Sequence, residues 1–160
     1  MVSIIMPVYN ASLYLKQSIL SIQNQTFSDF ELLLINDHST DCSHSICQEF
    51  ARLDKRIILF DNTTSTHGPG VARNIGLKHA NGQYIFFMDA DDWIEPDLLQ
   101  SIIQQFSETH ADVIQFGFFY EYPEKSVKIS PYYSTKTLSR NDIEANFITF
   151  WSGNCQGSCQ

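Results

Sequence analysis

The chain has 160 residues, of which 43% are hydrophobic and 18% are charged, and its formal net charge is −8. This composition is typical of a globular protein with a hydrophobic core, and it excludes an intrinsically disordered chain. The acidic balance argues against nucleic acid as a partner, because binding a phosphate backbone requires a basic face. Neither a membrane-length apolar run nor the basic leader of a signal peptide is present, so we expect a cytoplasmic protein without a transmembrane segment.

Short apolar segments alternate with amphipathic ones along most of the chain. Buried strands are predicted where apolar and β-branched residues run together, at residues 2–8, 30–35, 56–60, 83–88 and 111–122. Between them, apolar residues that recur every three or four positions predict four helices. Polar and proline residues mark the expected helix starts: Asn10 or Ser12, Thr40 or Asp41, Pro69, and Pro96 with Asp97. This alternation predicts an α/β fold whose parallel sheet is covered by helices on both faces.

Polar clusters follow each of the first four predicted strands. In parallel α/β sheets, ligands bind at the carboxyl ends of the strands, so these clusters are expected to share one edge. Two common phosphate-binding motifs, G-x-G-x-x-G after the first strand and G-x-x-x-x-G-K-[ST], are absent from the sequence. A diphosphate at this edge would therefore have to be held by a cation.

The stretch YIFFMDADDW, residues 84–93, ends a strand in three carboxylates. On an extended chain, the side chains of Asp89 and Asp91 would point the same way, roughly 6.5–7 Å apart. Carboxylate oxygens select a hard cation such as Mg²⁺ or Mn²⁺. The cluster therefore indicates a divalent metal site, although Asp92 or Glu95 could simply cap the helix that begins at Pro96.

Three pieces of the chain carry a resemblance: SIIMPVYN, QTFSDFELLLINDHSTD and GPGVARNIGLKHANGQYIFFMDADDWIEPDLL. Over roughly residues 2–106, the chain resembles the family 2 glycosyltransferases, which have the GT-A fold. The resemblance implies a Rossmann-like, mostly parallel sheet. It implies metal-assisted, inverting transfer of a sugar from a nucleoside diphosphate, here UDP, to a saccharide or lipid-linked acceptor. The products would be polysaccharides or glycolipids of the cell envelope, made in the cytoplasm or at the inner face of the membrane.

The resemblance also implies roles for particular residues in holding the donor nucleotide. Pro7 and Tyr9 would line the base pocket, with Tyr9 stacking on uracil, and Asp37 would accept a hydrogen bond from the base. Arg73 would lie near the base and the phosphates. Each has a structural alternative: Tyr9 could pack in the core, Asp37 could cap the next turn as an Asx motif, and Arg73 could pair with a carboxylate.

In the same way, the resemblance implies that Asp89 contacts the ribose and that Asp91 binds the Mn²⁺ or Mg²⁺ that holds the diphosphate. The sequence departs from the family pattern at Asn36, where an aspartate is usual. It departs again at His38, where a glycine is usual and special backbone dihedrals are expected.

Beyond Tyr122 the alternation of apolar and amphipathic segments weakens. We expect a donor domain over residues 1–122 and a partial acceptor-side segment over 123–160, with a helix at 139–151. The general base of the family is not identifiable; the late carboxylates are Glu121, Glu124, Asp142 and Glu144. A nucleotide-sugar-binding module with little or no turnover is therefore an alternative, and a phosphoryl-transfer protein is a weaker one.

Four residues close in sequence, His38, Cys42, His44 and Cys47, could also be imagined as a metal site. Their spacing does not match the usual structural zinc patterns. We expect free thiols and surface histidines instead.

Overall fold

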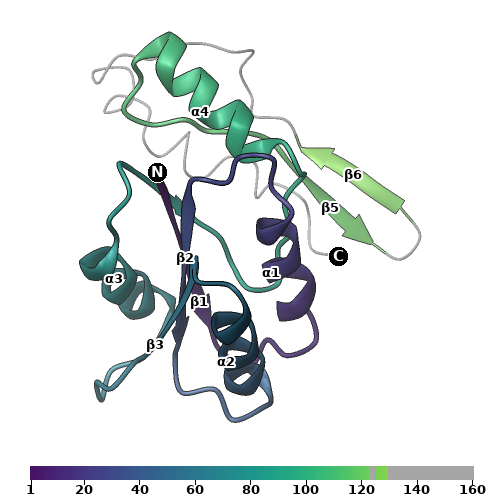
Figure 1. Cartoon of the computed structure of the whole chain (residues 1–160). Helices are drawn as coiled ribbons and strands as arrows, with labels where there is room; N and C mark the ends of the chain where they lie inside the picture. Colours follow the sequence, from purple (N-terminus) through teal and green to yellow (C-terminus); the bar gives the residue numbers. More distant parts are fainter. Residues whose placement is uncertain (123–124, 130–160) are drawn as a thin grey trace. The chain divides into compact units, whose positions relative to one another are not determined.

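A computed structural model describes residues 1–122 and 125–129 of the chain (Figure 1). The chain divides into two compact units, Met1–Ser101 and Ile102–Gln160. The predicted boundary between a donor domain and an acceptor-side segment at residue 122 stays a prediction. In chain order, the elements of the first unit are β1 (Val2–Val8), α1 (Leu15–Gln23), β2 (Phe30–Asn36), α2 (Ser43–Leu53), β3 (Ile57–Asp61), α3 (Pro69–His79) and β4 (Tyr84–Phe87).

The four strands of the first unit form one parallel sheet in the order β3-β2-β1-β4. The first and fourth strands are therefore neighbours. Pro7 of β1 pairs with Ile35 of β2, and Ile5 pairs with Phe87 of β4. This register brings the residues that follow β1, β2 and β4 to one end of the sheet.

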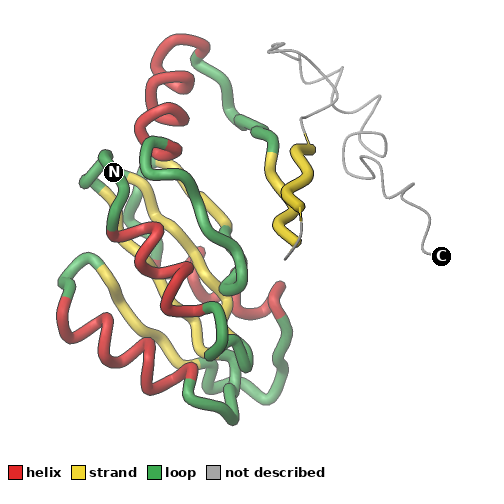
Figure 2. The backbone as a smooth tube through the Cα atoms, turned by 90° about the vertical axis from the view of Figure 1, so that its right-hand side faces the viewer, coloured by secondary structure: helices red, strands yellow, loops and turns green. Residues whose placement is uncertain are grey.

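Helices cover both faces of this sheet, which confirms the predicted α/β architecture. Helix α3 lies on one face, while α1 and α2 lie together on the other (Figures 1 and 2). On the α3 face, Ile5, Leu33 and Ala72 belong to one buried cluster. Alternate residues of the same strands, such as Ile4 and Leu32, are fully buried too. Burial on both faces explains why β1 and β2 are apolar almost throughout.

The expected helix boundaries differ from the structure at several points. Helix α1 begins at Leu15, after Tyr14, and its first turn has no side-chain cap, so the predicted caps Asn10 and Ser12 are wrong. Helix α3 begins at Pro69, as expected, and ends at His79. The Asn10 side chain binds the loop after β2 instead, whereas Asp41 accepts from the amide of Ser43 at the start of α2 and also from the amide of Ser12.

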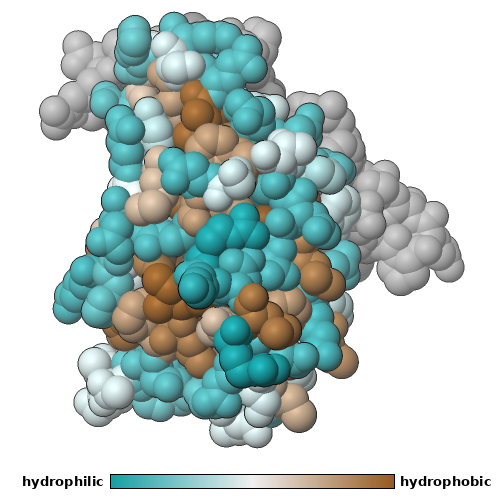
Figure 3. Space-filling model, viewed as in Figure 1, coloured by the Kyte–Doolittle hydropathy of each residue, from teal (hydrophilic) through white to brown (hydrophobic). Residues whose placement is uncertain are grey.

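Helix α4 (Leu98–Thr109) continues past the division between the units, and the strands β5 (Phe118–Tyr122) and β6 (Lys125–Ile129) pair antiparallel. The strand predicted from residue 111 begins only at Phe118. The helix predicted at 139–151 lies outside the described residues. Among the helices that the structure does describe, none combines the length and apolar character needed to cross a bilayer. Hydrophilic residues cover most of the face seen in Figure 3, with hydrophobic patches between them.

Candidate functional site

Two exposed loops start side by side at the carboxyl end of the sheet, the lower end in Figure 1. The amide of Asp37, directly after β2, donates to the carbonyl oxygen of Val8 at the end of β1 at 2.8 Å. Pro7 is half-buried within β1, whereas 63% of Tyr9 is exposed. This exposure removes the alternative that Tyr9 packs in the core, and it leaves the ring available to a ligand.

Asp37 is buried, with 4% of its surface exposed, and both carboxylate oxygens accept short hydrogen bonds. Oδ1 accepts from Asn62 Nδ2 at 2.6 Å, and Oδ2 accepts from the amide of Gly68 at 2.6 Å. The φ of 121° at Gly68, which precedes α3, is one that residues with a Cβ rarely adopt. These partners are 25 and 31 residues away in sequence, so the carboxylate is not used in the Asx turn that the sequence suggested as an alternative.

A reciprocal clasp joins the loop after β1 to the loop after β2. Asn10 Oδ1 accepts from the amides of Thr40 and Asp41 at 2.8 and 3.3 Å. In return, the Asp41 carboxylate accepts from the amides of Ser12 and Ser43 at 3.1 and 2.9 Å. These hydrogen bonds outweigh the effect of desolvation and hold the pKa of Asp41 well below its usual range. The clasp fixes the loop of Tyr9 against the loop of Asp37.

The backbone of both clasped loops is unusual. Asn10 has a φ of 48° and His38 has a φ of 63°, both in the left-handed region. The special dihedrals expected where His38 replaces a glycine are therefore present. Asparagine tolerates this region better than most residues, so Asn10 suits both its backbone and its role in the clasp.

Arg73 from α3 reaches the end of β4. Its Nη2 donates to Asp89 Oδ1 at 2.6 Å, and both side chains are partly exposed. The ion pair that was an alternative for Arg73 thus exists, and it joins two of the predicted site residues. Among the described residues, Arg73 Nε is a buried nitrogen that has no hydrogen-bond partner. Arg73 therefore keeps donor capacity beside Asp89.

The three carboxylates after β4 lie on a turn and not on the extended chain that was expected. Strand β4 ends at Phe87, and the amide of Asp92 donates back to the carbonyl oxygen of Asp89 at 3.2 Å. Desolvation of the carboxyl group and repulsion from Asp91 and Asp89 raise the pKa of Asp92. The turn therefore concentrates negative charge that Arg73 neutralises only at Asp89.

Polar residues of α1 and of the loop that follows it, which the sequence analysis missed, fix the position of this turn. Ser18 Oγ donates to the carbonyl oxygen of Ala90 at 2.8 Å, and the amide of Ile94 donates to Ser21 Oγ at 3.2 Å. Gln25 is buried and bonds both to the carbonyl oxygen of Glu95 at 2.7 Å and to the amide of Leu99 at 3.0 Å. The partners are 70 to 74 residues apart in sequence, so no local pattern predicts them.

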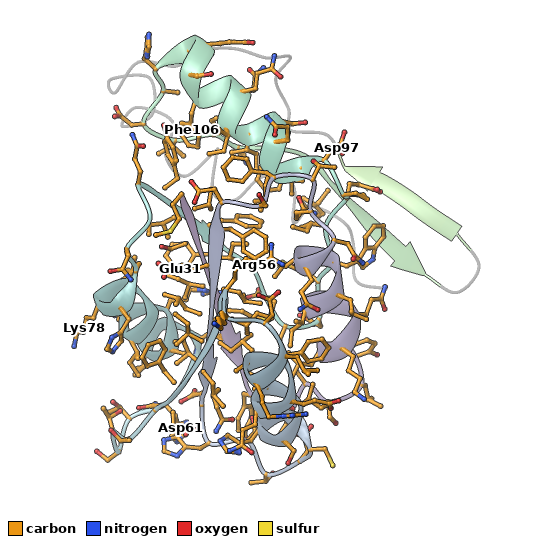
Figure 4. The ribbon with its side chains drawn as sticks, in the orientation of Figure 1. Glu31, Arg56, Asp61, Lys78, Asp97 and Phe106 are labelled. Atoms are coloured by element: carbon orange, nitrogen blue, oxygen red, sulfur yellow. The ribbon has the colours of Figure 1, made fainter. Side chains whose placement is uncertain are left out.

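The thiol and imidazole groups near α2 do not form a metal site. Within residues 1–122 and 125–129, no group of three or more His, Cys, Asp or Glu side chains is arranged to hold a metal ion. Cys42 and Cys47 are free, as expected. Burial, with repulsion from Asp61, raises the pKa of the Cys47 thiol to about 12, which makes it unreactive at neutral pH. Figure 4 labels Asp61 at the lower end of the sheet.

The family model described as glycosyl transferase family 2 matches residues 3–160. An uncharacterized glycosyltransferase from Haemophilus influenzae is 48% identical over 110 residues, which cover 69% of this chain and 44% of that protein. Among solved structures, S. aureus TarS in complex with UDP-GlcNAc is similar, with a TM-score of 0.62 and 31% identity over 69% of this chain and 32% of TarS.

The mannosyltransferase PcManGT from Pyrobaculum calidifontis, solved with GDP-Man and Mn²⁺, has a TM-score of 0.61 and is 25% identical. That likeness covers 68% of this chain and 32% of PcManGT. The chain spans between 17% and 44% of the length of the first three curated relatives that it matches.

Proposed function

The chain belongs to glycosyl transferase family 2, and on that premise we propose that it holds the donor site of an enzyme that transfers a sugar from UDP to an acceptor hydroxyl. The observation on which the proposal rests is the placement of the residues after β1, β2 and β4. The exposed Tyr9, the buried Asp37 and the pair formed by Arg73 and Asp89 all lie at the carboxyl end of adjacent strands. This is where parallel α/β sheets bind their ligands.

In the proposed complex, Tyr9 stacks on uracil, with Pro7 behind it in the floor of the base pocket. Asp37 accepts a hydrogen bond from the imide N–H of the base. A carboxylate with two oxygens has about four acceptor positions, and the structure uses one on each oxygen. Capacity for one more donor therefore remains. The choice of UDP is supported by the UDP-GlcNAc complex of TarS.

At the other end of the nucleotide, we assign Asp89 to the ribose and Asp91 to a divalent metal, Mn²⁺ or Mg²⁺. The donor set fits such an ion, because Mg²⁺ and Mn²⁺ prefer carboxylate oxygens, and Mg²⁺ is usually held by one or two carboxylates plus substrate phosphates and water. Desolvation, together with repulsion from Asp91 and Asp89, raises the pKa of Asp92, and this repulsion also favours a cation here. When bound, the metal would stabilise the leaving diphosphate as a Lewis acid.

The residues of the chain would bind and orient the donor for in-line attack by an acceptor hydroxyl, with inversion at the sugar. Arg73 would hold the Asp89 carboxylate in place and neutralise part of the local negative charge. The general base and the saccharide or lipid-linked acceptor are not assigned to described side chains. Glu124, Asp142 and Glu144 lie outside the described residues.

Competition calorimetry with nucleoside diphosphates tests this function. In the presence of Mn²⁺, we expect UDP to bind at least tenfold more tightly than CDP. CDP presents a ring acceptor where uracil presents its imide donor, and it would leave Asp37 facing a lone pair. GDP serves as a third ligand, because guanine also carries a ring N–H. Equal affinity for UDP and CDP would remove Asp37 from base recognition, and tighter binding of GDP would overturn the assignment of uracil.

A further inference from the structure

We propose that Asn62, at the end of β3, is a positioning residue that aims the carboxylate of Asp37 at the donor base. The inference rests on the proposed function, because it assumes that Asp37 reads the base. No pattern in the sequence singles out Asn62, which stands at the start of the loop NTTSTHG. Its role follows from its burial and its hydrogen bonds.

Asn62 is buried, with 4% of its surface exposed, and all the polar positions of its side chain are used. Nδ2 donates to Asp37 Oδ1 at 2.6 Å and to the carbonyl oxygen of Thr66 at 2.8 Å. Oδ1 accepts from the amide of Thr64 at 2.9 Å and from its hydroxyl at 2.7 Å. One side chain therefore holds both the carboxylate of Asp37 and the fold of the loop at 62–66.

The orientation of Asp37 is fixed from two sides. Asn62 holds Oδ1, and the amide of Gly68 holds Oδ2 at 2.6 Å. The hydrogen bond from Asn62 can be removed by truncating its side chain, whereas the hydrogen bond from Gly68 comes from the backbone. Asn62 is therefore the position at which the restraint on Asp37 can be tested. With the Asn62 side chain absent, the Gly68 amide holds only one oxygen, and the carboxyl group would turn more easily about the Cβ–Cγ bond. The hydrogen bond from the base N–H to Asp37 would then weaken, while binding of the diphosphate would change little.

The test compares Asn62→Ala with wild type by calorimetry of UDP and CDP in Mn²⁺. We expect UDP affinity to fall about tenfold, as a hydrogen bond to a charged group is lost from the network, and CDP affinity to change little. The ratio of UDP to CDP affinity should therefore narrow. A purely structural role would weaken both ligands in parallel and leave the ratio unchanged, which would overturn the proposal.

Asn81→Ala is a matched control at the opposite end of the sheet. Asn81 also donates from Nδ2 to a buried carboxylate, that of Glu31, at 3.3 Å. Its removal should cost stability without changing the preference for UDP. A narrowed ratio in this variant would show that loss of stability alone changes base preference, and it would overturn the role assigned to Asn62.

Asp37→Asn separates failure of this inference from failure of the proposed function. If Asp37→Asn leaves the ratio of UDP to CDP affinity unchanged, Asp37 does not contact the base. Both the base contact and the positioning role of Asn62 are then overturned. If Asp37→Asn narrows the ratio but Asn62→Ala does not, the base contact stands and only the role of Asn62 is overturned.

A measurement on the wild-type chain avoids dependence on folding of the variants. The side-chain amide protons of Asn62 can be followed by NMR during titration. Because one of them is bonded to Asp37, we expect UDP to shift the Asn62 side-chain signals strongly and CDP to shift them less. Unchanged signals at saturating UDP would contradict the proposal.

Discussion

The negative charge of Asp92 lowers the stability of the folded chain when no ligand is bound. Desolvation and the neighbouring Asp91 and Asp89 raise its pKa, so the folded state binds a proton more readily than the unfolded state. Ionised Asp92 therefore destabilises the fold at neutral pH, and this penalty is relieved as the pH falls. A cation at Asp91 would relieve the same repulsion at neutral pH.

Asp92→Asn should raise the melting temperature at pH 7 in the presence of a chelator, because one of three like charges is removed. The sign is fixed by the raised pKa: the gain should shrink when the pH is lowered and Asp92 in the wild type becomes protonated. Thermal unfolding at pH 7 and near pH 4 checks both statements. A variant less stable than wild type at pH 7 would contradict the repulsion described here.

Asp91→Asn should instead weaken UDP binding in Mn²⁺ by at least tenfold and abolish the dependence on Mn²⁺. The reason is that diphosphate and carboxylates repel each other without an intervening cation, by about 4 kcal/mol for charges 4 Å apart at an effective dielectric of 20. Calorimetry of Asp91→Asn beside Asp92→Asn makes the comparison. Equal losses in the two variants would count against Asp91 as the metal ligand.

At the scale of the elements, α3 approaches the sheet most closely at Gly76. A Cβ added there would collide with the side chain of Ile5 on β1, whereas a Cβ at Gly70 of the same helix would meet nothing within 4 Å. Gly76→Ala should therefore destabilise the fold by about 1–3 kcal/mol through overpacking, despite the better helix propensity of alanine. Gly70→Ala is the control and should be neutral or stabilising. Chemical denaturation of both variants measures the difference, and equal stability would contradict the close packing.

The amino end of the sheet is held by Glu31, labelled in Figure 4 above Asp61. Its Oε1 accepts from Ser3 Oγ at 2.5 Å and from the amide of Asn81 at 2.6 Å. Burial alone would raise the pKa of Glu31, but these bonds, with those from the Asn81 side chain and Gly82, lower it. Ionised Glu31 therefore stabilises the fold at neutral pH.

Glu31→Gln should cost about 1–3 kcal/mol at pH 7, because a neutral amide replaces a buried carboxylate that accepts several bonds. The folded pKa is below the ordinary value, so the contribution of Glu31 is present above pH ~4.5 and is lost as the pH falls further. The stabilities of variant and wild type should thus converge in acid. A gap that stays constant from pH 7 to pH 3 would refute this linkage.

The strands could be predicted from the sequence because burial on both faces leaves an almost continuous apolar run, as in β1 and β2. The helix starts could be predicted only in part: Pro69 begins α3 as expected. Asn10 is a good capping residue by type, but its side chain binds a loop about 30 residues away, and Asp41 bonds to that distant loop as well as to the start of α2. Likewise, the resemblance singles out Asp37 and Asp91 as candidates, whereas the hydrogen bonds of Asn62 and Gln25 involve partners that only the fold brings near.

At the scale of the whole molecule, the proposed function assigns donor binding to described residues, but it assigns the removal of a proton from the acceptor to none of them. General base catalysis typically contributes 10²–10⁴-fold. We therefore expect the 160-residue chain to release or transfer sugar from a labelled UDP-sugar far more slowly than 1 s⁻¹. Turnover on the order of 1 s⁻¹, within the usual enzyme range, would show that a carboxylate such as Glu121 or Asp142 is a working base. Such a rate would also exclude a binding module without turnover.

The most direct test of the donor site is a calorimetric titration of the wild-type chain with UDP, first in Mn²⁺ and then after a chelator is added. We expect saturable binding of one UDP per chain in Mn²⁺ and an affinity at least tenfold weaker without the metal. Absence of saturable binding in Mn²⁺, or binding that the chelator leaves unchanged, would contradict a metal-dependent UDP site at Asp91.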